Sequence, residues 1–161
     1  MNCPYGIGEV HMKKPIIIMI VAGLLLASLA LADSGVKWYT LTEGQVKSKA
    51  EGKPVIVDFF FGKGCPRCEF LEKEVYSNPS IARKIMEDFI PIRIDLTRKL
   101  SEEEQKLGEK YEFKNDCLLI FLDRSGDLVK DATGKKLCFI DKVDPDEFIK
   151  YLDTVKSRVS K

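Results

Sequence analysis

Residues 59–71 read FFFGKGCPRCEFL, an apolar run that stops at glycines, presents two cysteines and continues as an amphipathic segment. This order predicts a buried strand that delivers a dithiol to the start of a helix. In that position Cys65 faces unpaired backbone N–H groups and the positive end of the helix dipole, which favour the thiolate over the thiol. Lys63 and Arg67 add positive charge beside it. Cys68, three residues on, can close a small disulfide as the resolving thiol.

The amino terminus has the pattern of a secretory signal peptide. Lys13 and Lys14 precede an apolar run over residues 16–32, which ends in the small-x-small motif ALA. Because this run approaches the length of a membrane-spanning helix, an uncleaved anchor is the alternative. Both readings place the rest of the chain in the periplasm or outside the cell, where disulfides persist.

These features predict how the chain is divided. We expect Met12 to be the true start, residues 1–32 to form the leader and signal peptide, and residues 33–161 to form one domain. Their length is ordinary for a single hydrophobic core.

Removal of the leader leaves a chain without net charge. Lys plus Arg falls from 26 to 24, and Asp plus Glu falls from 25 to 24. Such a chain has no electrostatic footprint for nucleic acid, so no nucleic-acid partner is expected. His11, the single histidine, also leaves with the leader, which excludes a Cys-His nucleophile, a Ser-His triad and a histidine metal ligand from the domain.

The rest of the sequence predicts a mixed α/β sheet. A strand, a helical region and a second strand require a parallel pair with a right-handed crossover, and a closing hairpin and helix follow, so helices cover both faces. The predicted elements are a helix at 42–50, a strand at 55–61, helices at 65–76 and 79–89, a strand at 90–96, a helix at 101–111, strands at 117–122 and 128–140, and a helix at 144–159.

Three phrases resemble exported members of the thioredoxin superfamily. They are EGKPVIVDF at 51–59, the Cys-x-x-Cys pair followed by Glu-Phe, and SNP at 77–79. The periplasmic carboxy-terminal domain of the transmembrane thiol:disulfide interchange protein is similar in this way. The resemblance runs from about residue 36 to 155 and implies a thioredoxin fold, with Cys65 as the attacking thiol and Cys68 as the resolving thiol.

Two positions near the dithiol depart from the family pattern. Gly64 stands where most relatives have an aromatic residue before the first cysteine. The buried acid of thioredoxins lies six residues before that cysteine, but here Phe59 has that spacing and Asp58 lies one residue further back. Since a shift of one residue in a strand reverses the face, Asp58 is either a proton relay or only a strand-end carboxylate.

A third departure concerns Cys117, which aligns with the family's cis-proline. A cis bond before a residue other than proline costs about 3–4 kcal/mol, so we expect a trans peptide after Asp116. Cys117 can be an inert buried residue, can pair with Cys138 in a second disulfide, or can join Cys65 and Cys68 in a soft-metal or iron–sulfur site.

Together these features favour an exported thiol-disulfide oxidoreductase that uses its Cys-Pro-Arg-Cys motif. Pro66 and Arg67 tune the reaction as the two intervening residues, and we favour the reductase or isomerase direction. We expect no cofactor and a monomer. The expected partners are cysteine-containing proteins and a thiol-disulfide redox partner, with a membrane electron transporter as a candidate. The alternative is a non-enzymatic metal or iron–sulfur module that uses Cys65, Cys68 and Cys117.

Overall fold

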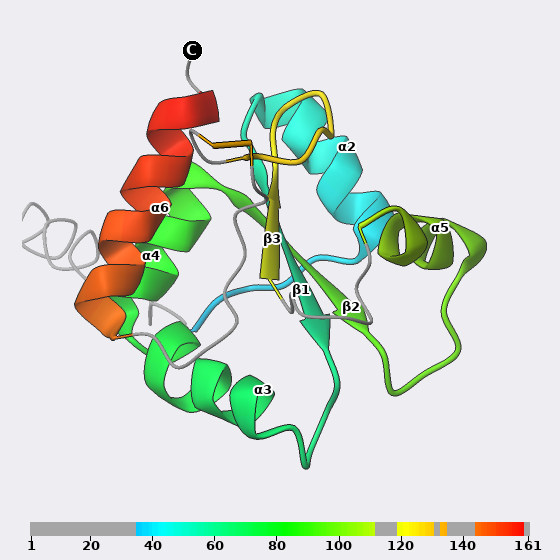
Figure 1. Cartoon of the computed structure of the whole chain (residues 1–161), viewed down its shortest axis with the longest axis horizontal. Helices are drawn as coiled ribbons and strands as arrows, with labels where there is room; N and C mark the ends of the chain where they lie inside the picture. The colour runs from blue at the N-terminus through cyan, green and yellow to red at the C-terminus, as the bar shows by residue number, and fades with distance from the viewer. Residues whose placement is uncertain (1–34, 112–118, 131–132, 135–143, 160–161) are drawn as a thin grey trace, which may run out of the picture. The chain divides into compact units, whose positions relative to one another are not determined.

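The computed structural model describes residues 35–111, 119–130, 133–134 and 144–159 (Figure 1). Predictions about the leader, Cys117 and Cys138 lie outside these residues. The described elements are α2 (Leu41–Glu51), β1 (Val55–Phe60), α3 (Pro66–Phe70), η1 (Leu71–Tyr76), α4 (Pro79–Asp88), β2 (Ile90–Asp95), α5 (Glu102–Lys110), β3 (Leu119–Leu122) and α6 (Pro145–Val159).

The described strands form a mixed sheet in the order β2-β1-β3. β1 pairs with β2 in parallel, with Val55 opposite Ile90, and with β3 in antiparallel, with Val55 opposite Leu122. Parallel pairing of strands joined by helices needs a crossover connection, which α3, η1 and α4 provide. The predicted mixed sheet is therefore confirmed. An additional parallel bridge joins Tyr39 to Ile92 at the outer side of β2.

The chain reverses after β3, as the sequence predicts. The amide of Gly126 donates to the carbonyl of Asp123 at 3.0 Å, and Gly126 has a φ of 82°, which suits glycine. The returning segment begins to pair at Leu122 and Leu128, and the Val129 amide donates to the Phe121 carbonyl at 2.9 Å. The predicted continuation of this strand to residue 140 extends beyond the described residues.

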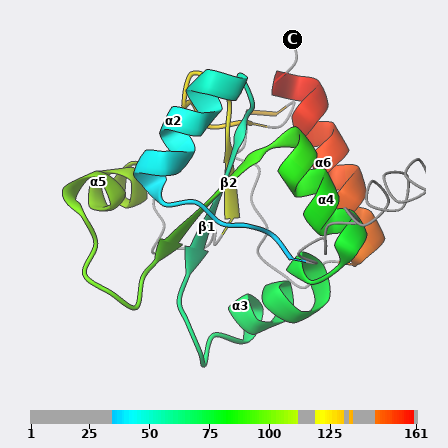
Figure 2. The ribbon, with the colours of Figure 1, turned by 180° about the vertical axis from the view of Figure 1, so that it is seen from behind.

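Side chains alternate between two apolar layers, one on each face of the sheet. Ile56 and Phe121 point to the layer formed with η1, α4 and α6, whereas Val57 and Ile120 point to the layer formed with α2 and α5. Figures 1 and 2 show α4 and α6 side by side on the first face. Helices thus cover both faces, and each strand is buried, which explains the continuous apolar runs in the sequence.

Local caps set the helix boundaries. Asn78 accepts hydrogen bonds at the start of α4 with Pro79 in the first position, and Ser101 forms a capping box with Glu104 at α5, both as predicted. The start of α2 differs from the prediction. Its cap is Thr40, in a capping box with Glu43, so the helix begins at Leu41 rather than Thr42.

Gly44 in α2 gives a test of how tightly this face is packed. A Cβ at Gly44 would lie 2.2 Å from Cγ1 of Ile92, whose β-branched side chain is only 1% exposed. Gly44→Ala should therefore lower the free energy of unfolding by about 1–3 kcal/mol, although alanine favours helix by about 1 kcal/mol. Urea unfolding measures this change in the free energy of unfolding. Val46→Ala, at a site 64% exposed on the same helix, should change stability by less than about 0.5 kcal/mol, and an equally neutral Gly44→Ala would contradict the packing.

Candidate active site

A short loop connects β1 to the dithiol, and glycine is required in it. Gly62 has a φ of 78°, and a Cβ there would lie 2.5 Å from Cγ2 of Thr97. Gly64 has a φ of 90°. Residues with a Cβ rarely adopt such φ values, so the two glycines that the sequence places before the cysteines allow the chain to turn into α3.

Cys65 caps the first turn of the helix. Its backbone is extended, with φ −95° and ψ 102°, and its Sγ accepts a hydrogen bond from the amide of Cys68 at 3.2 Å. Pro66 occupies the first helical position, where its fixed φ fits and its missing N–H needs no partner. The structure therefore places the Cys65 sulfur against the helix amides, as the sequence predicts.

The two sulfurs are bonded to each other, and they differ in accessibility. A disulfide joins Cys65 to Cys68, with the Cα atoms 5.3 Å apart. The Cys68 residue is 4% exposed, whereas Cys65 is half-buried. An incoming sulfur can thus approach Cys65 more readily than Cys68.

The dithiol helix does not continue as a regular α-helix. From Leu71 to Tyr76 it has π geometry, and the amide of Ser77 donates to the carbonyl of Glu72, five residues back. This segment buries Leu71, Val75 and Tyr76 against the sheet. The sequence predicts helix as far as Tyr76 but does not predict this change to π geometry. Short π segments within α-helices are frequent at functional sites.

A buried ionic cluster lies between the sheet and this π segment. Asp58 of β1 and Arg93 of β2 are partners in the parallel register, and Arg93 Nε donates to Asp58 Oδ2 at 2.7 Å. The Nη2 of the same guanidinium donates to Glu72 Oε1 of η1. Tyr76, also on η1, donates from its hydroxyl to Asp58 Oδ1 at 3.5 Å. Arg93 and Tyr76 therefore connect the helix that begins at the dithiol to two strands.

Aromatic rings enclose the Arg93 guanidinium. Its central carbon lies 4.1 Å from the ring centroid of Trp38, 4.8 Å from that of Phe60 and 5.7 Å from that of Tyr76. The Trp38 and Tyr76 rings meet edge to face at 4.9 Å. A planar, weakly hydrated cation is favoured in such surroundings, where lysine could not make the same stacking and forked contacts.

Burial raises the pKa of Asp58 from 3.8 to about 6, although the Arg93 charge and hydrogen bond act to lower it. Removal from water disfavours the carboxylate more than one arginine favours it, and the nearby Glu72 charge acts in the same direction as burial. Burial, followed by the charge of Asp58, also raises the pKa of Tyr76 well above its usual value. Asp58 is thus a buried acid on the face of the sheet that η1 covers.

The residues predicted to tune the dithiol gather beside it. Lys63, Pro66 and Arg67 line an open groove of about 500 Å³ together with Phe61, Gly64 and Cys65. Asp58 does not line this groove. The structure thus brings the predicted cations and Pro66 to Cys65 and places Asp58 in a separate buried cluster.

Three residues of this cluster were not predicted from the sequence: Arg93, Glu72 and Trp38. Arg93 had a detectable signal, because it is the one charged residue between isoleucines in the strand segment IPIRI, and its position pairs with Asp58 once the parallel register is known. Trp38 and Glu72 give no comparable signal in the sequence.

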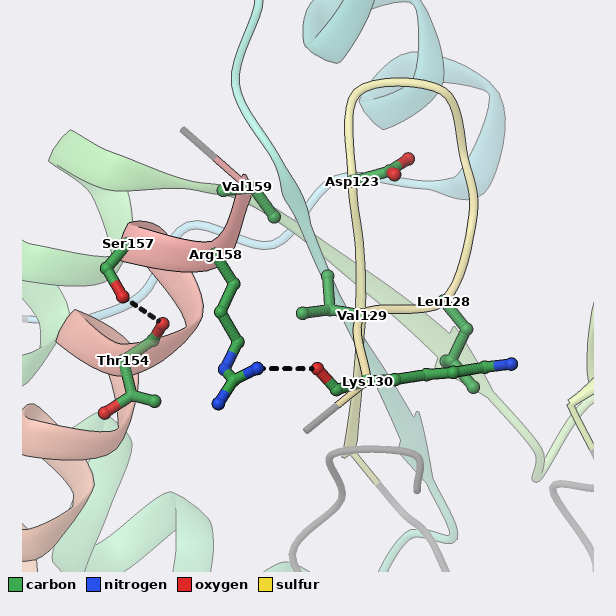
Figure 3. Close-up of a pocket in the computed structure, with 8 residues that line it drawn as sticks. All are labelled: Asp123, Leu128, Val129, Lys130, Thr154, Ser157, Arg158 and Val159. Carbon is green, nitrogen blue, oxygen red and sulfur yellow. Dashed lines mark hydrogen bonds between the residues drawn. The ribbon is translucent and has the colours of Figure 1, made fainter. Parts of the chain in front are cut away.

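A second cavity, of about 480 Å³, lies between the end of α6 and the segment after β3 (Figure 3). Arg158 Nη1 reaches across it to the Lys130 carbonyl at 3.4 Å. Because Leu122 of β3 pairs with the first residue of β1, this cavity and the dithiol lie at opposite ends of the sheet. It adds no group to the chemistry of the cysteines.

In the part of the chain that the structure describes, no three His, Cys, Asp or Glu side chains are grouped so that they could hold a metal ion. Within the same ranges, every helix is too short or too polar to cross a membrane.

Comparison with known proteins identifies similar sequences and folds. The family model described as thioredoxin-like matches residues 37–120. The solved structure of a thioredoxin from Thermus thermophilus is 23% identical, with a TM-score of 0.60, over 78% of this chain and 90% of that one. A DsbH oxidoreductase is 14% identical, with a TM-score of 0.60, over 93% and 94%. The oxidised DsbD C-terminal domain from Neisseria meningitidis is 20% identical, with a TM-score of 0.55, over 73% and 98%. No curated protein matches.

The raised pKa of Asp58 predicts a pH-dependent loss of stability. Between about pH 4 and 6 the native carboxyl holds a proton that the unfolded chain has released, so this group's contribution to stability falls as pH rises. Relative to Asp58→Asn, the wild type should lose about 2 kcal/mol of unfolding free energy from pH 4 to pH 7, as measured in urea.

Asp146→Asn, which removes an exposed carboxyl on α6, is the matched control for this measurement. The difference between that variant and the wild type should change much less over the same range. A difference between the wild type and Asp58→Asn that stays constant from pH 4 to pH 7 would contradict the burial of an ionisable Asp58.

Proposed function

The chain belongs to the thioredoxin-like family, and from that premise we propose that it is an exported protein thiol-disulfide oxidoreductase that uses Cys65 and Cys68. One observation carries the proposal: the two cysteines form a disulfide at the start of a helix, and the first is the more accessible. A bond between such neighbouring sulfurs can open and close without rearrangement of the sheet.

The proposed reduction of a substrate takes two steps. The Cys65 thiolate attacks one sulfur of a substrate disulfide, that S–S bond breaks, and the leaving sulfur takes a proton. Cys68 then loses its proton and attacks Cys65 Sγ in the mixed disulfide. The second substrate thiol leaves, and the Cys65–Cys68 disulfide forms, so two electrons pass to the substrate. In the reverse direction a substrate thiolate attacks the oxidised pair.

The residues around the pair support this chemistry. The amide of Cys68 donates to Cys65 Sγ, and Lys63 and Arg67 line the same groove, so a negative sulfur is favoured there. Pro66 starts the helix beside them. We assign Lys63, Pro66 and Arg67 the tuning of the Cys65 thiolate and of the reduction potential.

We propose that Asp58 accepts the proton that Cys68 loses in the second step. Its pKa of about 6 lies near neutrality, where a carboxyl can both accept and release a proton. It is buried on the face that η1 covers, and its contacts to Arg93 and Tyr76 hold it in place.

The proposal also covers the redox direction of the reaction, the partners of the protein and its location. We favour the reductase or isomerase direction, with cysteine-containing proteins as substrates and a thiol-disulfide redox partner, such as a membrane electron transporter, that restores the dithiol. Residues 1–32 would act as the leader, with Met12 as the start, and residues 33–161 would act as a monomer in the periplasm or outside the cell. The amino-terminal pattern of basic, apolar and small residues supports the export.

Substitution of the cysteines tests the proposal directly. The wild type should accelerate the reduction of insulin by dithiothreitol, followed by turbidity. Cys65→Ser should abolish the acceleration because it removes the attacking sulfur, and Cys68→Ser should stop turnover and accumulate a mixed disulfide visible by mass spectrometry. Cys117→Ser is the matched control and should keep at least about half of the activity. Full activity in Cys65→Ser would refute the proposal.

A second experiment tests the role of Asp58. For a positioned proton acceptor, loss of the carboxylate should slow release from the mixed disulfide about tenfold or more at pH 7. The deficit of Asp58→Asn should shrink at alkaline pH, where the Cys68 thiol ionises unaided. Rates from quenched-flow experiments between pH 6 and 10 measure this, and parallel pH profiles for the two proteins would rule out the assignment.

A further inference from the structure

We propose that the groove beside Cys65 selects substrates that carry an acidic residue next to the reacting cysteine. This inference rests on the proposed function and adds the substrate class. It concerns the open groove that Cys65 helps to line.

The groove is open and lies where a substrate must approach. Its described lining residues all lie within 61–67, the loop after β1 and the first turn of α3, and it encloses about 500 Å³. Figure 1 shows this loop and α3 at one end of the described sheet. Phe61 is 43% exposed there, although aromatic side chains are usually buried. An extended segment can therefore pass over Phe61 and Pro66 and reach the half-buried Cys65.

The charged side chains among the described residues that line the groove are both basic. Lys63 and Arg67 line it, and no described carboxylate does. Glu69 is the acid closest in sequence, and its Oε1 accepts a hydrogen bond from the Gly64 amide at 2.9 Å, so it serves to hold the loop. Among the residues that the structure describes, the Lys63 side chain has no hydrogen-bond or ion-pair partner. An acidic side chain of a bound segment is the complement of the Lys63 ammonium, beside which Arg67 adds a second positive charge.

The same cations also favour the Cys65 thiolate, and a useful test must separate the two effects. Thiolate stabilisation changes the rate with every substrate by the same factor. Charge recognition changes the ratio of the rates for an acidic and a basic substrate. The factor that comes from thiolate stabilisation is the same in both rates and cancels in this ratio. The ratio is therefore the quantity that reports on the groove.

The experiment uses three synthetic peptides, each with one disulfide and identical except for Glu, Gln or Lys beside the attacked cysteine. The second-order rate constant for oxidation of the reduced protein is measured by acid quench and mass spectrometry. At low ionic strength the Glu peptide should react about tenfold faster than the Lys peptide, with Gln between them. In about 0.5 M salt the ratio should fall toward one, because exposed charges are screened.

Matched charge reversals locate the effect. Lys63→Glu should bring the ratio close to one or invert it. Lys49→Glu makes the same charge change at an exposed position of α2. Because α2 precedes the start of β1 and the groove follows its end, this variant should leave the ratio within about twofold of the wild type. Circular dichroism checks that both variants are folded.

Two outcomes would overturn the inference, and they differ in meaning. Equal rates for the three peptides, or a ratio that Lys63→Glu leaves unchanged, would refute charge selection while thiol-disulfide exchange stands. Absence of reaction with every peptide would refute the proposed function and the selectivity together.

Discussion

The Arg93 guanidinium holds the helix that carries the dithiol against the sheet. It donates to Asp58 on one strand and to Glu72 on the π segment, and three aromatic rings enclose it. Loss of Arg93 would leave the buried Asp58 carboxylate without its cation, whereas the Glu72 side chain is 42% exposed and would stay in contact with water. The dithiol lies at the start of that helix, and its position relative to the sheet depends on the contacts of Arg93 and on the apolar residues that η1 buries.

Asp58 and Cys65 lie in opposite kinds of surroundings. Asp58 lies in an apolar layer, and its pKa of about 6 results from the dominance of burial over one buried cation. Cys65 lies at the surface, among helix amides and two basic side chains. In the proposed reaction, a buried carboxylate that can take up a proton and an accessible sulfur beside basic side chains serve the two halves of the exchange near neutral pH.

Much of the fold could be predicted, because its signals are local. Asn78 followed by Pro79, and Ser101 followed by Glu104, determine helix starts through hydrogen bonds within four residues. The two glycines before Cys65 and the proline after it determine a turn into a helix. The start of α2 was predicted two residues from its cap because two neighbouring threonines offer the same chemistry, and only Thr40 forms the capping box.

The sequence by itself thus determined the strand, the turn, the dithiol at a helix start and the mixed sheet, since periodicity and capping depend on near neighbours. Only the tertiary structure decided which face Asp58 occupies, that Arg93 lies beside it, and that Thr97 leaves no space for a side chain at Gly62. Those contacts join residues about 35 positions apart, and the parallel register of β1 and β2, which no local pattern specifies, brings them together.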